Sequence, residues 1–172
     1  MTDSTFASTE LHSASQADET SFSGSEDHAL ANARSIAQTA GLVFSGSVAP
    51  TDAWRLVQNN QAILVDVRTA EERKFVGYVA DAVHVPWATG TALTRNPRFV
   101  KELETKVKDK SRVVLLLCRS GKRSTAAAEA AAKAGFSNIF NVAEGFEGEL
   151  NPDQQRGQLG GWRFHQLPWI QD

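Results

Sequence analysis

Short apolar runs alternate with amphipathic stretches between about residue 43 and residue 142. Apolar runs of four or five residues are typical of strands that are buried on both faces of a parallel sheet. The runs that predict strands are Ala62–Val65, Ala82–Val85, Val113–Leu117 and Ile139–Val142. The stretches that predict helices begin at Pro50 or span residues 70–76, Pro97–Lys108 and Ser124–Ala134. This alternation predicts an α/β domain with a mostly parallel central sheet.

The first part of the chain lacks this pattern. Residues 1–33 contain no Lys or Arg and are rich in Ser, Thr, Asp and Glu. Because residues 1 to about 27 offer little apolar surface, we expect them to be disordered. A short helix is predicted from His28 to Ala40, and its alanine-rich face favours the role of a spacer. We therefore divide the chain into an N-terminal extension, residues 1–42, and a folded domain, residues 43–172.

The last segment, Gly157–Asp172, contains two of the four Trp residues and several Gly and Pro residues. Gly and Pro interrupt regular structure, so the segment is predicted to be mostly loop. We expect its aromatic side chains to pack this tail onto the domain.

The composition limits the function classes and the location. A chain of 172 residues with 41% hydrophobic and 22% charged residues is typical of one soluble globular domain. The formal net charge of -2 does not favour nucleic acid as a partner. No apolar run approaches the roughly 20 residues that span a membrane, so no membrane partner is expected. The N-terminus has the features of neither a secretory signal nor a transit peptide, and the expected location is cytoplasmic.

Cys118 is the single cysteine of the chain. One cysteine excludes an intrachain disulfide and a zinc site built from paired cysteines. The histidines show no metal-binding spacing, and we expect neither a metal ion nor a cofactor. A lone cysteine is most often a small buried apolar residue, so the surrounding sequence has to decide its role.

The loop that begins at Cys118 favours a reactive residue. It follows the most apolar predicted strand and opens an alanine-rich helix, whose N-terminal N–H groups favour an anion. Arg119, Lys122 and Arg123 add positive charge within five residues of the sulfur, which stabilises the thiolate over the thiol. Gly121 lets the backbone curl, so that successive amides can point at one centre. We predict that Cys118 is a nucleophile and that the loop binds substrate through Arg119, Ser120, Gly121, Lys122, Arg123 and Ser124.

Four further residues are weaker candidates for a supporting role. Asp66 and Arg68 follow a predicted strand, and we interpret them first as part of a structural ion pair, with Glu72 as the partner of Arg68. Trp87 fits the mouth of a pocket and the core equally well. Glu144 lies in a loop after the last predicted strand, near the expected site.

These residues resemble the rhodanese family over roughly Val48–Phe146. The loop Cys118–Arg123 is similar to the family's Cys-Arg-x-Gly-x-Arg form. Three further segments are similar to family signatures in the same order: Leu64–Arg68 with Glu71 and Glu72, Gly77–Pro86, and Asn141–Phe146. Tyr78 stands where many members have His, and Ala80-Asp81 replaces Pro-Gly. The tail extends past the usual domain end, and the resemblance implies that it belongs to a subgroup of single-domain bacterial members.

The resemblance implies a three-layer fold with a mostly parallel five-stranded sheet flanked by helices. It also implies a ping-pong sulfurtransferase. The Cys118 thiolate would attack the outer sulfur of thiosulfate or a related small anionic donor, and the sulfite would leave. Cyanide, a thiol or a sulfur-accepting protein would then remove the sulfur from the Cys118 persulfide.

Two other functions remain open. A phosphatase or arsenate reductase on the same fold would use Cys-x5-Arg, one residue longer than the Cys-x4-Arg formed by Cys118 and Arg123. A sulfur carrier for a protein partner would differ from the sulfurtransferase only in its acceptor. A binding module for a protein partner would lack catalysis. Hydrolysis of an aryl phosphate, or uptake of one sulfur atom at Cys118, distinguishes these functions.

Overall fold

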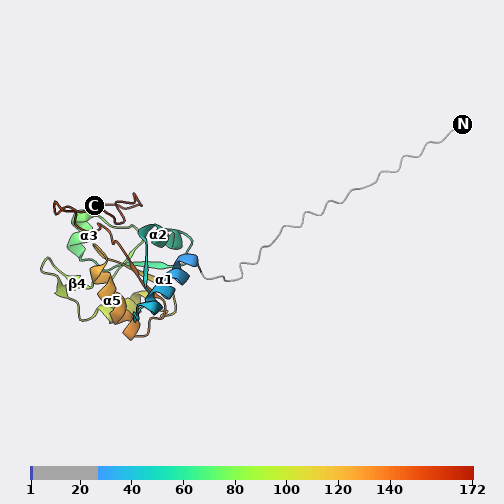
Figure 1. The fold of residues 1–172 in the computed structure, drawn as a ribbon, viewed down its shortest axis with the longest axis horizontal. Helices are drawn as coiled ribbons and strands as arrows, with labels where there is room; N and C mark the ends of the chain where they lie inside the picture. The colour runs from blue at the N-terminus through green and yellow to red at the C-terminus, as the bar shows by residue number, and fades with distance from the viewer. Residues whose placement is uncertain (2–26) are drawn as a thin grey trace.

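A computed structural model describes Met1 and residues 27–172 (Figure 1). The predicted disorder of residues 1 to about 27 therefore falls on a segment that lies almost entirely outside the described residues. The helices are α1 (His28–Thr39), α2 (Pro50–Gln58), α3 (Ala70–Val76), α4 (Phe99–Val107) and α5 (Lys122–Lys133). The strands are β1 (Ser47–Val48), β2 (Ile63–Asp66), β3 (Val83–His84), β4 (Ala88–Thr89), β5 (Thr94–Arg95), β6 (Val114–Leu117) and β7 (Ile139–Val142).

The central sheet has five strands in the order β1-β7-β6-β2-β3, and every neighbouring pair is parallel. This confirms the predicted α/β fold with a five-stranded sheet. β6 lies in the middle of the sheet, between β7 and β2, and all four of its residues are buried. The carboxyl end of a central parallel strand is where open α/β sheets usually place a site.

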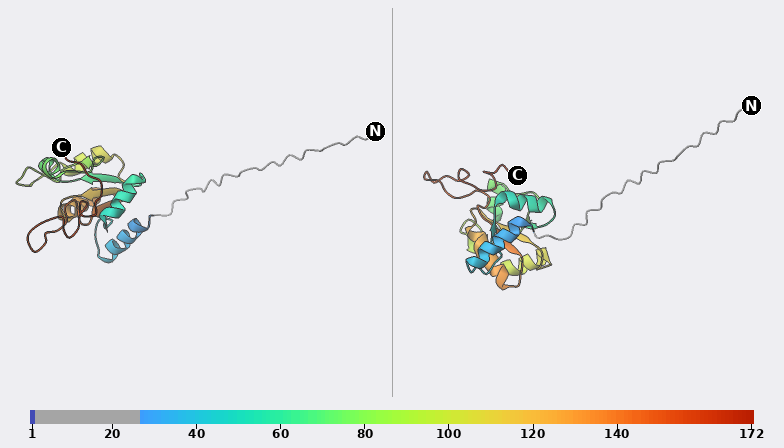
Figure 2. Two further views of the ribbon diagram at one scale, coloured as in Figure 1. Left: turned by 90° about the horizontal axis from the view of Figure 1, so that it is seen from above. Right: turned by 45° about the vertical axis from the view of Figure 1, so that its right-hand side comes forward.

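Alternation along the strands divides the core into two layers. Leu115 and Leu117 of β6 face the side covered by α1, α2 and the C-terminal tail, whereas Leu116 and Cys118 face α4 and α5. Figure 2 shows helices on both sides of the sheet. Because side chains alternate with a period of two, Cys118 continues the row of β6 residues that faces α5.

α1 confirms the predicted helix at His28, but its expected role as a spacer is wrong. Leu30 and Ala33 lie in the same apolar layer as α2 and the sheet. Before the helix, Asp27 forms an ion pair with Arg55 of α2 at 2.6 Å. The hydrogen bond from Arg55 holds the pKa of Asp27 below its usual value. Alanine on this face allows a close approach rather than weak contact, so the helix is docked on the domain.

The tail behaves as predicted, because its aromatic side chains pack on the domain. Trp162 is fully buried and meets Trp54 of α2 edge to face, with 5.8 Å between the ring centroids. Near the end, Tyr78 and Ile170 exchange backbone hydrogen bonds of 2.8 Å. The tail therefore lies beside α3, where Figure 1 places the C-terminus.

Candidate active site

Cys118 directly follows β6 at its carboxyl end, and only 1% of the residue is exposed. Two groups from the start of α5 lie against its sulfur. The Gly121 N–H donates to Sγ at 3.1 Å, and the Ser124 hydroxyl oxygen lies 3.1 Å from Sγ. The sulfur thus sits at the N-terminus of a helix, where dipoles and free N–H groups favour a negative charge. Cys118 belongs to the apolar layer next to α5, and the side chain faces the helix start from there.

The backbone of the loop supplies the N–H groups that were expected from the sequence. Gly121 is the residue before α5 and has φ of +89°, a conformation that side-chain-bearing residues rarely adopt. Within residues 27–172, the backbone N–H groups of Arg119, Ser120, Lys122 and Arg123 have no hydrogen-bond partner in the protein. Unpaired N–H groups of this kind can hold an anion next to the sulfur.

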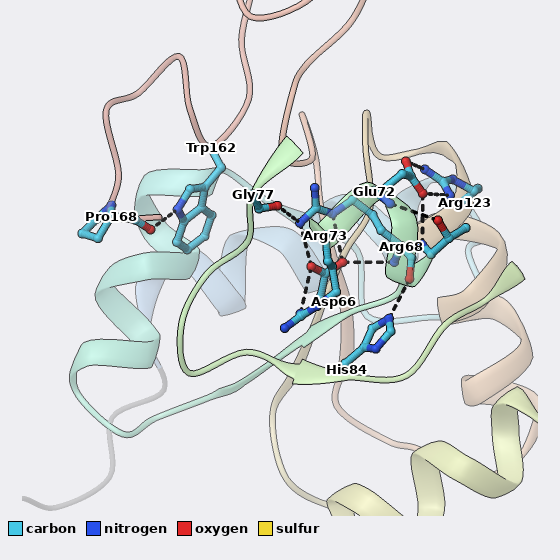
Figure 3. A network of polar contacts seen from close by, with 10 residues as sticks. Asp66, Arg68, Glu72, Arg73, Gly77, His84, Arg123, Trp162 and Pro168 are labelled. Atoms are coloured by element: carbon cyan, nitrogen blue, oxygen red, sulfur yellow. Dashed lines mark hydrogen bonds and ion pairs between the residues drawn. The ribbon is translucent and has the colours of Figure 1, made fainter. Parts of the chain in front are cut away.

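The charged side chains of the loop divide into two groups. Lys122 is 80% exposed and lies 3.5 Å from Glu149, and Arg119 is partly exposed. By contrast, Arg123 donates two hydrogen bonds to Glu72 of α3, at 2.7 and 2.6 Å (Figure 3). The solvent-accessible positive charge of the loop therefore comes from Arg119 and Lys122.

The Glu72–Arg123 pair ties α3 to α5. Burial raises the pKa of Glu72, but hydrogen bonds from Arg123 and from the Thr69 N–H outweigh this effect and leave that pKa below its usual value. Burial likewise lowers the pKa of Arg123, but the Glu72 carboxylate and the nearby Cys118 sulfur leave it raised. The expected pair of Glu72 with Arg68 is therefore wrong, because Glu72 lies in the first turn of α3 and faces α5 instead.

Asp66 and Arg68 form an ion pair with each other, and neither side chain is exposed. Arg68 donates to the Asp66 carboxylate at 3.0 and 2.8 Å and to the Gly77 carbonyl at 2.8 Å. Its guanidinium also lies 4.0 Å from the centroid of the Phe146 ring, which adds a cation–π contact. Figure 3 shows this network beside the Glu72–Arg123 pair. Asp66 is paired in the sheet with Leu117, so the network lies next to the start of the cysteine loop.

The segment after β7 supports the cysteine loop from outside. The Phe146 N–H donates to the Cys118 carbonyl at 2.7 Å, and the Glu147 N–H donates to the Arg119 carbonyl at 2.9 Å. Gly145 has φ of +68°, and a Cβ at this position would lie 2.6 Å from the Cys118 carbonyl oxygen. Contacts that were not predicted from the sequence thus fix the backbone of the loop. The available signal was Gly145, which lies in the segment Asn141–Phe146 that resembles the family.

Asn141 is a second residue whose contact with the site was not predicted from the sequence. It lies on β7, faces α5 and is 5% exposed. Its Oδ1 is 2.6 Å from the Ser124 hydroxyl oxygen, and its Nδ2 donates to the Ser47 hydroxyl at 3.1 Å. The available signal was a polar residue within the apolar run Ile139–Val142.

Trp87 and Glu144 are held by neighbours other than the cysteine. Trp87 packs edge to face on Phe99, with 5.0 Å between the ring centroids, at the border of the layer that contains Cys118. The Glu144 carboxylate accepts hydrogen bonds from the Gly161 N–H at 2.6 Å and from the His165 ring at 2.7 Å. Glu144 thereby attaches the tail to the loop that follows β7.

Comparisons with known proteins identify the family of the chain. The profile of the rhodanese-like domain family matches residues 49–150. An uncharacterized protein of Rickettsia prowazekii, RP600, is 36% identical over 125 residues, which are 72% of this chain and 95% of the relative. The thiosulfate sulfurtransferase GlpE of Actinobacillus pleuropneumoniae is 28% identical over 103 residues, covering 59% of this chain and 82% of that protein.

A solved structure extends the comparison to the fold. Rv0390 of M. tuberculosis is 41% identical, has a TM-score of 0.64, and matches over 73% of this chain and 97% of its own. Within the described residues, no helix has the length and apolar character needed to cross a membrane. The family profile covers more than half of the sequence and includes the cysteine loop, so the chain belongs to the rhodanese-like domain family.

Proposed function

We propose that this protein is a sulfurtransferase that carries a sulfane sulfur atom as a persulfide of Cys118. The observation that carries the proposal is the position of its sulfur at the N-terminus of α5, 3.1 Å from the Gly121 N–H. Four further N–H groups of the same loop have no partner among the described residues, so an added anionic sulfur has donors ready for it. A relative of the chain, GlpE, is named a thiosulfate sulfurtransferase.

The reaction proceeds in two half-reactions. The Cys118 thiolate attacks the outer sulfur of thiosulfate, a new S–S bond forms, the S–S bond of thiosulfate breaks, and sulfite leaves with the electron pair. A nucleophile such as cyanide or a thiolate then attacks the outer sulfur of the persulfide. The S–S bond to Cys118 breaks, the thiolate is restored, and thiocyanate or a new persulfide leaves.

The charges at the loop favour an anionic donor. Arg119 and Lys122 lie at the exposed part of the loop, whereas Arg123 is bound by Glu72. Cations next to a reacting anion raise its local concentration and stabilise the leaving sulfite. Thiosulfate, with two negative charges, gains more from them than a donor without charge. We therefore propose thiosulfate or a donor of the same kind as the first substrate.

The test is a steady-state assay of the full chain with thiosulfate and cyanide, in parallel with an aryl phosphate. We expect thiocyanate formation, no phosphate release, and loss of activity in Cys118→Ser. Intact-protein mass spectrometry after thiosulfate treatment should show the mass of one added sulfur atom, and Cys118→Ser should lack it. Equal thiocyanate formation by Cys118→Ser would overturn the proposal.

Phosphatase chemistry has less support from the geometry. The loop has four residues between Cys118 and Arg123, and the guanidinium of Arg123 is bound to the Glu72 carboxylate. A guanidinium held by a carboxylate has fewer donors left for a phosphate. If the aryl phosphate is hydrolysed and thiosulfate is not used, the protein is a phosphatase. If sulfur is taken up without turnover to cyanide, the protein is a sulfur carrier for another acceptor, such as a thiol or a specific protein.

A further inference from the structure

We propose that Asn141 is a positioning residue whose side-chain amide reverses when Cys118 changes from a thiol to an anionic sulfur. The reversal lets the Ser124 hydroxyl donate its proton to the sulfur only in the reactive forms. The thiolate is one such form, and the persulfide is a second one that rests on the proposed function. The device consists of one amide between two hydroxyl groups, behind the cysteine loop.

A continuous chain of side chains leads from the sulfur to the edge of the sheet. The Ser124 hydroxyl oxygen lies 2.6 Å from Asn141 Oδ1, and 3.1 Å from both Cys118 Sγ and the Gly121 carbonyl oxygen. The Asn141 Nδ2 lies 3.1 Å from the Ser47 hydroxyl oxygen on the edge strand β1. Ser124 is fully buried and Asn141 is 5% exposed, whereas Ser47 is exposed. Water therefore cannot easily replace the two inner partners, and each hydroxyl proton has to be accounted for.

The geometry fits the thiol form of the cysteine. A serine hydroxyl has one proton, and the shortest contact of Ser124 is the one to Asn141 Oδ1. With that proton directed at the amide oxygen, the Ser124 oxygen is free to accept the S–H proton of Cys118. The amide nitrogen then donates to Ser47. Every donor in the chain has an acceptor, and every proton points away from the sulfur.

An anionic sulfur makes this arrangement unfavourable. Once the thiol has lost its proton to solvent, the sulfur is an acceptor and the Ser124 proton has to turn toward it. The Ser124 oxygen would then face Asn141 Oδ1 at 2.6 Å with no proton between them. A half-turn of the amide removes this conflict, because Nδ2 then donates to Ser124 and Oδ1 accepts from Ser47. Ser47 is at the surface, so its hydroxyl can rotate without loss.

Only a primary amide satisfies both arrangements. An aspartate of the same size accepts on both sides, so it would hold the Ser124 proton and withdraw it from the sulfur. The other charged groups near the sulfur come from the loop, from α3 and α5, and from the end of β2. They are Arg119 and Lys122, the Glu72–Arg123 pair, and the Asp66–Arg68 pair. None of them changes when Asn141 is substituted.

The test measures the alkylation of Cys118 by iodoacetamide as a function of pH. This neutral reagent reacts with the thiolate, and Cys118 is the single cysteine, so the rate reports on one residue. We expect Asn141→Asp to slow alkylation at neutral pH by about tenfold or more, because a hydrogen bond to a charged group is lost. Ser124→Ala should also slow it. Asn138→Asp, which adds the same charge just before β7 where the side chain contacts Arg34, should leave the rate within about twofold.

A double variant separates proton direction from charge. If Asn141→Asp acts by holding the Ser124 proton, most of its effect disappears in the Ser124→Ala background. If the two effects add fully, Asn141→Asp acts through its charge and the proposal is wrong. Urea unfolding of each variant identifies those that are folded, and Asn141→Gln, which keeps the amide, should recover part of the alkylation rate.

A direct observation follows the amide itself. In protein labelled with ¹⁵N, the Asn141 side-chain protons should show cross-peaks to the Ser47 methylene in the thiol form and to the Ser124 methylene after thiosulfate treatment. Unchanged cross-peaks together with normal alkylation of Asn141→Asp would overturn the proposal. Failure of the proposed function is a separate result. In that case the variants would still show the expected order of Cys118 alkylation rates, but Cys118 would take no sulfur from thiosulfate.

Discussion

At the scale of single residues, Gly121 and Gly145 fix the shape of the cysteine loop. Gly121 bends the chain before α5, and a Cβ there would collide with the Ala143 carbonyl. Gly145, two residues after Ala143, lies against the same loop, with an added Cβ 2.6 Å from both the Cys118 carbonyl oxygen and the Ser120 nitrogen. Both glycines have positive φ. The loop therefore packs against the backbone of the segment after β7 so closely that neither glycine position has room for a side chain.

We predict that Gly145→Ala lowers the rate of thiosulfate-to-cyanide transfer by at least about tenfold and destabilises the fold by about 1 to 2 kcal/mol. The methyl group has to displace the backbone of the loop, and positive φ adds strain. Gly157→Ala is the matched control, because Gly157 also has positive φ but has nothing within 4 Å of an added Cβ. Its stability loss should be smaller, because only the strain of positive φ remains, and its activity should be full. Equal activity of the two variants would contradict the prediction.

Part of the site was predictable because it is contiguous in the sequence. Cys118 and the basic residues after it follow one apolar run, so a single window contains the sulfur, the helix start and the charges. Asn141 and Gly145 reach the loop from a neighbouring strand, and no local pattern shows that contact. The predicted pair of Glu72 with Arg68 was wrong for the same reason. The choice between Arg68 and Arg123 depends on how α3 packs against α5.

At the scale of elements, the Glu72–Arg123 pair links helices α3 and α5 through two hydrogen bonds. Glu72 also closes the capping box of α3, because its side chain accepts from the Thr69 N–H while the Thr69 hydroxyl accepts from the Glu72 N–H. The Glu72 carboxylate thus caps the N-terminus of α3 and binds Arg123 in the first turn of α5. The site depends on this link because α5 starts at the cysteine loop.

The pair makes stability depend on pH in the acidic range. The folded protein holds the pKa of Glu72 below its ordinary value of 4.5, so the charged carboxylate stabilises the fold above that pH. This contribution is lost as pH falls through the folded pKa. We predict that Glu72→Gln lowers the free energy of unfolding at neutral pH and flattens its decline toward pH about 3. Urea unfolding over this range measures both effects.

Glu104→Gln is the matched control for that series. Glu104 pairs with Lys110, but 39% and 42% of these two side chains are exposed, so solvent screens the pair. We expect its unfolding free energies to follow those of the unsubstituted protein at every pH. If Glu72→Gln retains the acid dependence of the unsubstituted protein, other carboxylates are responsible for it.

Most helices and strands were predictable from periodicity, and the exceptions have physical reasons. β1 has two residues, which is too short for a pattern, and its place at the edge of the sheet comes from pairing with β7. The β4–β5 hairpin is equally short. α5 starts two residues before the predicted Ser124, because Gly121 takes the position before the helix without a side-chain cap.

At the scale of the whole molecule, Trp162 completes one of the two apolar layers of the core. It is fully buried among residues of α1, α2 and the sheet, and its ring N–H donates to the Pro168 carbonyl at 2.9 Å. Its backbone N–H also donates to the Gly145 carbonyl at 2.8 Å. The tail therefore completes the domain and reaches the segment that supports the cysteine loop.

We predict that Trp162→Ala destabilises the protein by about 3 to 5 kcal/mol, because it leaves a large cavity in this layer. Trp162→Phe should lose less, since a ring still fills part of the space. Leu159→Ala, at a position that is 59% exposed in the same tail, should change stability by about 0.5 kcal/mol or less. Thermal and urea unfolding followed by circular dichroism measures these differences. A small loss for Trp162→Ala would show that the tail is dispensable for folding.

The shared layer of α1 and Trp162 also matters during synthesis of the protein. Leu30 and Ala33 leave the ribosome early, but the indole that completes their layer emerges more than a hundred residues later. Until then, one apolar face of the nascent sheet stays open to water and to other chains. Partly made chains are therefore the form most exposed to aggregation, and a chaperone that binds apolar surface would protect them at this stage.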